Sequence, residues 1–157
     1  MKAQLGIKEA ETKKIASLLN KVLADEHVLY IKSRNSHWNV QSPDFHSMHA
    51  FFEEIYGELE VTIDEVAERI RTIGHFAVGT MAEYLKLTQL KEMQYKGHDA
   101  QGYLKELLAD FETIIQSLRD HIEDVAENTK DCGTEDFLIG ILQRHEARAW
   151  MIRSHLA

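Results

Sequence analysis

The sequence predicts an all-α protein, built as a bundle of four long helices with a short helix between the second and the third. One Pro and eight Gly among 157 residues leave few turn-forming positions, which argues against a turn-rich β fold. Apolar residues recur at helical spacing over four long segments. The segment 74–98, between the second and third of them, is too long for a tight turn. The length is that of one domain, so we expect a single domain over 1–157 with 1–8 as a short flexible arm.

The first two helices are expected to pack side by side around the turn that follows His37-Trp38. The first runs from residue 9 to residue 36. The second runs from 45 to 73, about 45 Å if it is straight. Ser42 is its expected N-cap, with Pro43 at the first helical position. An apolar stripe at helical spacing marks its buried face: Phe52, Ile55, Leu59, Ile63, Val66, Ile70 and Ile73.

The crossover and the third long helix have clear start signals. Thr80 and Glu83 have the spacing of a capping box, which predicts a short helix across the bundle. A crossover of this kind makes the second and third long helices parallel. Asp99 is the expected cap of the third long helix, which ends near Asn128.

The last helix is expected after a turn at 130–133. Thr134 is its predicted cap, and Glu135 and Asp136 suit the positive end of its dipole. Apolar residues then continue at helical spacing almost to residue 157.

Composition limits the classes of partner and compartment. The formal net charge of -8 argues against broad adhesion to nucleic acid or to an anionic membrane. Cys132 is the only cysteine, so no intrachain disulfide is possible and a reducing compartment fits. The N-terminus lacks an apolar signal core, and no stretch approaches a membrane span. We therefore expect a cytoplasmic protein that does not bind membranes.

The polar face of the second helix carries His49, Glu53, Asp64 and Glu68. These four positions share a sector of roughly 100° on the helical wheel, but His49 and Asp64 are about 22 Å apart along the axis. One chain therefore cannot bring them to one metal ion. A second, antiparallel copy related by a two-fold axis near Gly57 would place His49 and Glu53 of one chain beside Asp64 and Glu68 of the other.

His37, just before the turn, can join His49 in such a site. Two imidazoles and two or three carboxylates form a mixed nitrogen and oxygen site suited to iron or zinc. Trp38 would shield the site and pack the junction of the two helices. None of the nine histidines has Glu three positions before it, so the ordinary intrachain Glu-x-x-His site is missing. We read His46 and His27 as structural or surface residues. The simpler alternative is that the acidic face is only solvated and the imidazoles are structural.

The joint pattern of His37-Trp38-Asn39, His49 twelve residues after His37, and Asp64-x-x-x-Glu68 followed by Arg69 resembles the Dps family of mini-ferritins. The resemblance extends over nearly the whole chain, including the central insertion and the final helix with Trp150. It implies a ferritin-like bundle and a ferroxidase that oxidises Fe(II), preferably with hydrogen peroxide, at a di-iron site shared between two subunits. It also implies a hollow dodecamer that stores ferric mineral and protects the cell from oxidative damage.

The resemblance further implies pores on three-fold axes, lined by acids near the start of the last helix. The matching positions are Glu127, Asp131 and Asp136. Cys132 and Gly133 fall where acids are common in the family, so the pore is expected to be less negative than usual. The alternative is that these acids only cap helix ends.

DNA binding in this family usually depends on flexible Lys-rich tails that contact phosphates. The N-terminal arm has few lysines, offset by acids, and no basic tail precedes Ala157. We therefore expect weak or no DNA binding. Two alternatives to the iron-storage function remain: a DNA-compacting protein of the same fold with little ferroxidase activity, and a purely structural helical oligomer that oxidises no Fe(II).

Overall fold

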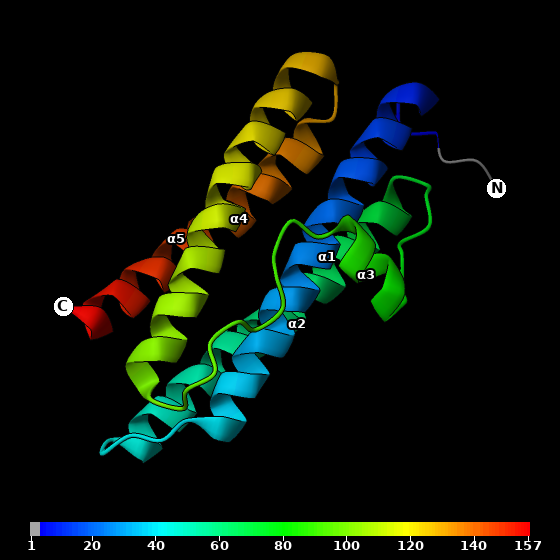
Figure 1. Ribbon diagram of the computed structural model, residues 1–157. Helices are drawn as coiled ribbons and strands as arrows, with labels where there is room; N and C mark the ends of the chain where they lie inside the picture. The colour runs from blue at the N-terminus through cyan, green and yellow to red at the C-terminus, as the bar shows by residue number, and fades with distance from the viewer. Residues whose placement is uncertain (1–3) are drawn as a thin grey trace.

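The computed structural model describes residues 4–157, which contain four long helices and one short helix (Figure 1). Those residues contain no β-strand. The all-α architecture and the short helix in the crossover are therefore as predicted. In chain order the helices are α1 (Glu9–Asn39), α2 (Phe45–Thr72), α3 (Met81–Leu87), α4 (Ala100–Asn128) and α5 (Cys132–Leu156).

The long helices form two antiparallel pairs, α1 with α2 and α4 with α5, and α1 also packs on α4. The short helix α3 lies against α1. After α3 the chain runs back along the bundle to the start of α4, so that α2 and α4 point the same way (Figure 1). This is the parallel relationship that the long crossover predicts.

The core contains the apolar stripe predicted for α2. Ile63 is only partly buried but packs against the core. Each fully buried side chain of this size contributes about 1.5–3 kcal/mol relative to an exposed one. The other members of the stripe are buried: Phe52, Ile55, Leu59, Val66, Ile70 and Ile73.

The crossover is fixed to the bundle at both ends of α3. At its start, Thr80 and Glu83 form the predicted capping box. At its end, the buried carboxylate of Asp25 on α1 accepts hydrogen bonds from the Thr88 hydroxyl, at 2.6 Å, and from the Gln89 backbone N–H, at 2.9 Å. Because these bonds satisfy polar groups of an irregular segment, the crossover has a defined path over α1.

The start of α2 and the end of α1 differ from the prediction. The helix α1 continues to Asn39, so His37 lies in its last turn. The prediction of Ser42 as N-cap and Pro43 as first helical residue is wrong, because the N-cap is Asp44. The Ser42 hydroxyl instead accepts the Asp44 backbone N–H at 3.2 Å, which builds the turn before the helix.

The C-terminal ends of the helices follow their expected signals. The helix α2 ends one residue before Ile73, followed by Gly74 at φ 94°, a left-handed conformation that glycine adopts without strain. Asp99 caps α4 as predicted, and α4 ends at Asn128.

The helix α5 begins earlier than predicted, at Cys132. Its N-cap is Asp131, whose Oδ1 accepts the Thr134 backbone N–H at 2.9 Å, so the prediction of Thr134 as cap is wrong. Thr134 already lies inside α5, where its hydroxyl donates to Asp131 Oδ2 at 2.6 Å and accepts from Arg69 Nε at 3.0 Å.

The predicted N-terminal arm lies partly outside the described residues, which begin at residue 4. Residues 4–8 precede α1 without regular secondary structure. No helix within residues 4–157 is long and apolar enough to cross a membrane.

Candidate metal centre

The two predicted imidazole ligands lie face to face where α1 and α2 meet. The His37 and His49 rings stack with centroids 3.7 Å apart and planes 23° apart. His37 is 8% exposed, and His49 is partly exposed. Phe45 stacks on His49 at 5.0 Å. The last turn of α1 and the first turns of α2 thus bring together two side chains twelve positions apart in the sequence.

A reciprocal pair of hydrogen bonds fixes the orientation of both rings. His37 Nδ1 lies 2.8 Å from the His49 carbonyl oxygen, and His49 Nδ1 lies 2.8 Å from the His37 carbonyl oxygen. A carbonyl only accepts, so each Nδ1 carries the proton and donates it. In the neutral ring the other nitrogen, Nε2, then has a free lone pair. Metal-binding histidines are commonly oriented in this way by a bond from the second nitrogen.

The three predicted carboxylates are exposed along α2. Glu53 lies one turn beyond His49, and Asp64 and Glu68 follow in the second half of the helix. Within residues 4–157, no three His, Cys, Asp or Glu side chains are close enough to hold a metal ion. One chain therefore holds two parts of the predicted ligand set, well separated along α2.

Trp38 does not pack the junction between α1 and α2 within one chain. Its side chain is 62% exposed, because the last turn of α1 directs it outward. The Arg34 guanidinium lies 5.1 Å from the Trp38 ring centroid. That part of the prediction is wrong for the single chain, and shielding of the metal centre by Trp38 remains a prediction.

The predicted pore acids occupy two kinds of surroundings. Glu127 and Asp136 are exposed, near the end of α4 and the start of α5. Asp131 is 4% exposed and bonds to Arg69 Nη2 at 2.8 Å. Its charge is therefore offset within the chain. The Asp136 side chain also borders a surface hollow of about 450 Å³ that Glu68 borders from α2.

Two polar clusters in the bundle were missed from the sequence. The first is Glu26 on α1 with His145 on α5, where Oε1 and Nε2 are 2.7 Å apart. Glu26 falls within the apolar stripe of α1, between Leu23 and Leu29, and an acid within a buried stripe is a sequence signal for such a buried polar pair. The side chain of Glu26 is fully buried.

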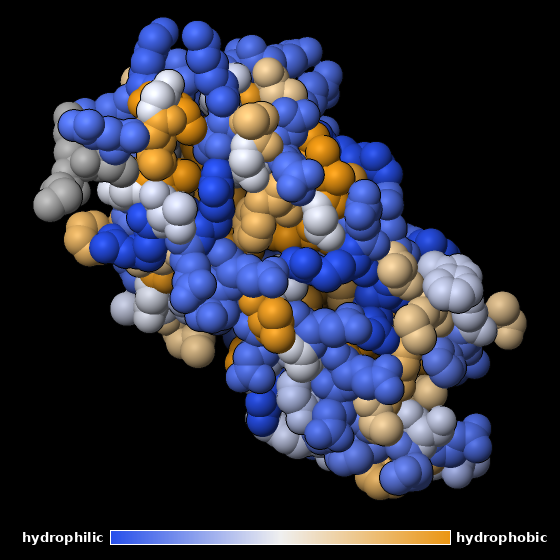
Figure 2. All heavy atoms as spheres, turned by 180° about the vertical axis from the view of Figure 1, so that it is seen from behind, coloured by the Kyte–Doolittle hydropathy of each residue, from blue (hydrophilic) through white to orange (hydrophobic). Residues whose placement is uncertain are grey.

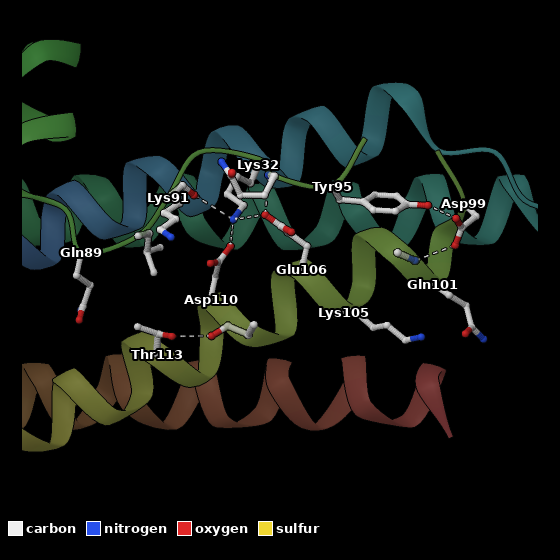
Figure 3. Close-up of a pocket in the computed structure, with 14 residues that line it drawn as sticks. Lys32, Gln89, Lys91, Tyr95, Asp99, Gln101, Lys105, Glu106, Asp110 and Thr113 are labelled. Carbon is white, nitrogen blue, oxygen red and sulfur yellow. Dashed lines mark hydrogen bonds and ion pairs between the residues drawn. The ribbon is translucent and has the colours of Figure 1, made fainter. Parts of the chain in front are cut away.

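The second cluster surrounds Lys32, which is 3% exposed (Figure 3). Its ammonium lies 2.9 Å from Glu106 Oε1, pairs with Asp110 and donates to the Lys91 carbonyl. Burial raises the pKa of Asp110, although Lys32 opposes the shift. Burial also acts to raise the pKa of Glu106, but hydrogen bonds from the Gln94 backbone and from Lys32 outweigh it and lower that pKa. Lys32 thus already pairs with two carboxylates, those of Glu106 and Asp110.

The two histidines set aside in the sequence are not part of the His37–His49 stack. His46 is exposed at the start of α2. His27 stacks on Tyr84 of α3 with ring centroids 3.8 Å apart, and burial lowers its pKa. Both positions fit the structural and surface roles that we expected.

Comparison with known proteins places this architecture in a family. A family model described as a ferritin-like domain matches residues 16–157. The chain is 39% identical over 152 residues to an uncharacterised low temperature-induced protein of Nostoc, covering 97% of this chain and 85% of that protein. It is 41% identical over 144 residues to DNA protection during starvation protein 2 of Bacillus anthracis, covering 92% of this chain and 97% of the relative.

Solved structures agree with this placement. The Dps protein of Vibrio cholerae, described as a member of a broad superfamily of ferritin-like diiron-carboxylate proteins, superposes with a TM-score of 0.92 at 33% identity, covering 100% of this chain and 98% of that one. Dps from Staphylococcus aureus gives 0.87 at 36% identity, covering 92% and 96%. Fold and sequence together define a ferritin-like four-helix bundle. The chain belongs, within that superfamily, to the Dps family of mini-ferritins.

Proposed function

We propose that this chain is a ferroxidase subunit that binds Fe(II) at a centre shared between two copies and oxidises it, preferably with hydrogen peroxide. The observation that carries the proposal is the locked His37–His49 pair. Both Nε2 lone pairs are left free by the reciprocal Nδ1 bonds. The matching carboxylates, Asp64 and Glu68, are exposed but lie too far along α2 to complete the centre within one chain.

A second copy supplies the missing ligands. A two-fold axis near Gly57 sets the α2 helices antiparallel and brings the imidazoles of one chain to the carboxylates of the other. A Cβ built at Gly57 meets no atom within 4 Å, so this part of α2 has room for a close neighbour. Val61, one turn from Gly57 on the same face, is 57% exposed, so an apolar side chain is available there for contact with a second copy.

Apolar atoms also reach the surface in several separate patches on the face seen in Figure 2. A chain that assembles with copies of itself has reason to expose such groups. We propose a closed homo-oligomer, a dodecamer in the manner of the family, whose hollow interior stores ferric mineral. The protein would then protect the cell from oxidative damage.

The donor set fits iron as substrate. Neutral imidazole suits Fe(II), and carboxylate oxygens become more favourable ligands as the ion becomes Fe(III), a harder cation. The balanced reaction is two Fe(II), one hydrogen peroxide and two protons giving two Fe(III) and two water molecules. Peroxide is reduced to water by two electrons, one from each iron, so no hydroxyl radical is released. Zinc fits the same ligands and would occupy the site without reacting.

Stopped-flow absorbance after mixing the apoprotein with Fe(II) and peroxide tests the proposal. The wild-type protein should form ferric product much faster than the double variant His37→Ala/His49→Ala. Double replacement of His27 and His46 by Ala is a matched control that removes two imidazoles outside the centre, and it should keep the wild-type rate. Equal rates for wild type and the His37/His49 variant would contradict the proposal.

A further inference from the structure

The ring of Tyr56, on α2, lies beside the first imidazole of the centre. Its centroid is 5.2 Å from that of His37, and the two planes are 80° apart. The stack with His49 therefore restrains the His37 imidazole from one direction, and the nearly perpendicular Tyr56 ring restrains it from another.

Tyr56 is itself held in place from α1. The Arg34 guanidinium lies 4.6 Å from the Tyr56 ring centroid and 5.5 Å from that of Tyr30. Arg34 Nη1 donates to the Tyr30 hydroxyl at 2.7 Å. The Tyr30 and Tyr56 rings meet at 89° with centroids 6.2 Å apart. We call Tyr30, Arg34 and Tyr56 the Arg34 cluster.

The ligand set proposed above does not include the Arg34 cluster. A guanidinium has no lone pair to give to a cation, and the contact between Tyr56 and His37 is made by the ring. Arg34 also contacts the Trp38 ring, so the exposed indole and the Tyr56 ring lie against the same cation. Its chemistry points to holding side chains rather than to binding or reacting.

We propose that Tyr56 is a positioning residue for the metal centre: its ring, fixed by Arg34 and Tyr30, holds the His37 imidazole in the orientation that presents Nε2 to the metal. This inference rests on the proposed function. The Nδ1 bond to the His49 carbonyl restrains the ring in its plane, whereas Tyr56 restrains movement out of the stack. Without the Tyr56 ring, the His37 imidazole has room to leave the stack with His49. Metal binding must then first return the imidazole to its position, which weakens the affinity.

Cobalt(II) binding tests this without any oxidation step. The change is Tyr56→Leu, which keeps apolar bulk but removes the ring. Loss of an outer-shell partner of a metal-binding histidine typically costs 10–100-fold in affinity, and we expect at least about tenfold weaker Co(II) binding. The visible absorption of imidazole-bound cobalt should change shape as well. Tyr56→Phe, which keeps the ring, should restore wild-type affinity and spectrum.

The control is Tyr84→Leu. Tyr84 stacks on His27, so this variant removes a tyrosine–histidine contact outside the centre, one that is stacked rather than edge-on. It should leave cobalt affinity unchanged. If Tyr56→Leu fails to assemble, Arg34→Lys serves instead. It keeps the charge but loses the planar guanidinium that stacks on Tyr56, and it should also weaken cobalt binding.

The outcomes separate the two proposals. One outcome is that the His37/His49 double variant loses cobalt binding while Tyr56→Leu binds cobalt as tightly as wild type. That result refutes the positioning role but supports the metal centre. A Tyr56→Phe variant as weak as Tyr56→Leu also refutes it, because the ring would then not be the active feature. If replacing His37 and His49 leaves the cobalt affinity unchanged, both the proposed function and this inference are overturned.

Discussion

Glu26 of α1 and His145 of α5 meet inside the bundle, with Oε1 of the carboxylate 2.7 Å from Nε2 of the imidazole. These helices belong to different antiparallel pairs, so the contact joins the two halves of the bundle. The Phe111 ring of α4 packs edge-on against His145 at 5.2 Å. Glu26 Oε2 is buried and has no hydrogen-bond partner among the described residues. A polar pair in such surroundings is costly to bury and more costly to break.

Breaking this pair should therefore destabilise the chain strongly. Glu26→Ala leaves the imidazole unpaired in the core, and we expect a loss of about 3–5 kcal/mol in the free energy of unfolding. The double variant Glu26→Leu/His145→Leu removes both polar groups and should cost much less. Urea denaturation at one fixed protein concentration measures both. Equal losses of unfolding free energy in the single and double variants would show that the lost side-chain volume, rather than the Glu26–His145 pairing, causes the destabilisation.

Replacing Gly57 should weaken association more than folding. A side chain at this position meets open space within one chain, and replacing a glycine within a helix favours the helix. Gly57→Leu should therefore preserve helicity while shifting the protein toward smaller species in light scattering. Gly140→Leu in α5, where a Cβ also meets nothing within 4 Å, is the matched control and should leave the subunit pair intact. If the Gly57→Leu protein associates as strongly as wild type, the two-fold axis does not lie near Gly57.

Asp136→Asn should slow iron uptake. The exposed carboxylate is near the start of α5, and removing its charge lowers the local concentration of cations without touching a proposed ligand. The initial rate of mineral growth at low ionic strength should fall, and the difference should shrink as salt is added. Asp120→Asn removes an equal charge from an exposed position on α4 and should change the rate less. Identical uptake rates for Asp136→Asn and Asp120→Asn would contradict a specific role of Asp136 in iron uptake.

DNA should not be retained at physiological salt. With a net charge of -8, the chain gains little from releasing counterions from phosphates. A gel-shift assay with the assembled protein should show free DNA, and any retarded band at low salt should disappear as salt rises. A band that persists at physiological salt would favour the DNA-compacting alternative.

Much of the fold could be predicted from local signals. The stripe of α2, the capping box at Thr80 and the Asp99 cap each depend on neighbours within a few positions, and all three are present. The errors lie at the starts of α2 and α5 and at the end of α1. Ser42 and Thr134 are both good caps by residue type, but the Ser42 hydroxyl accepts the Asp44 N–H in the preceding turn, and Thr134 already lies inside α5.

The site was only partly accessible from the sequence. Spacing indicated that His37 and His49 belong together, but their reciprocal Nδ1 bonds depend on where two backbones meet in space. Tyr56 gave no signal, because an aromatic residue on a helix is usually read as core. Glu26 gave a signal, an acid in an apolar stripe, but its partner is 119 positions away and only the fold brings it close.

The most direct test of the shared centre is complementation between two inactive chains. One chain carries His37→Ala/His49→Ala and the other Asp64→Ala/Glu68→Ala, and each alone should lose most peroxide-driven Fe(II) oxidation. In a mixed subunit pair, one centre lacks all four of these ligands and the other is complete, so each mixed pair should recover about half of the wild-type rate. Peroxide consumption by purified mixed shells is the measurement. Recovered activity is the predicted result, whereas mixed shells as inactive as the two parent variants would contradict a centre shared across a two-fold axis.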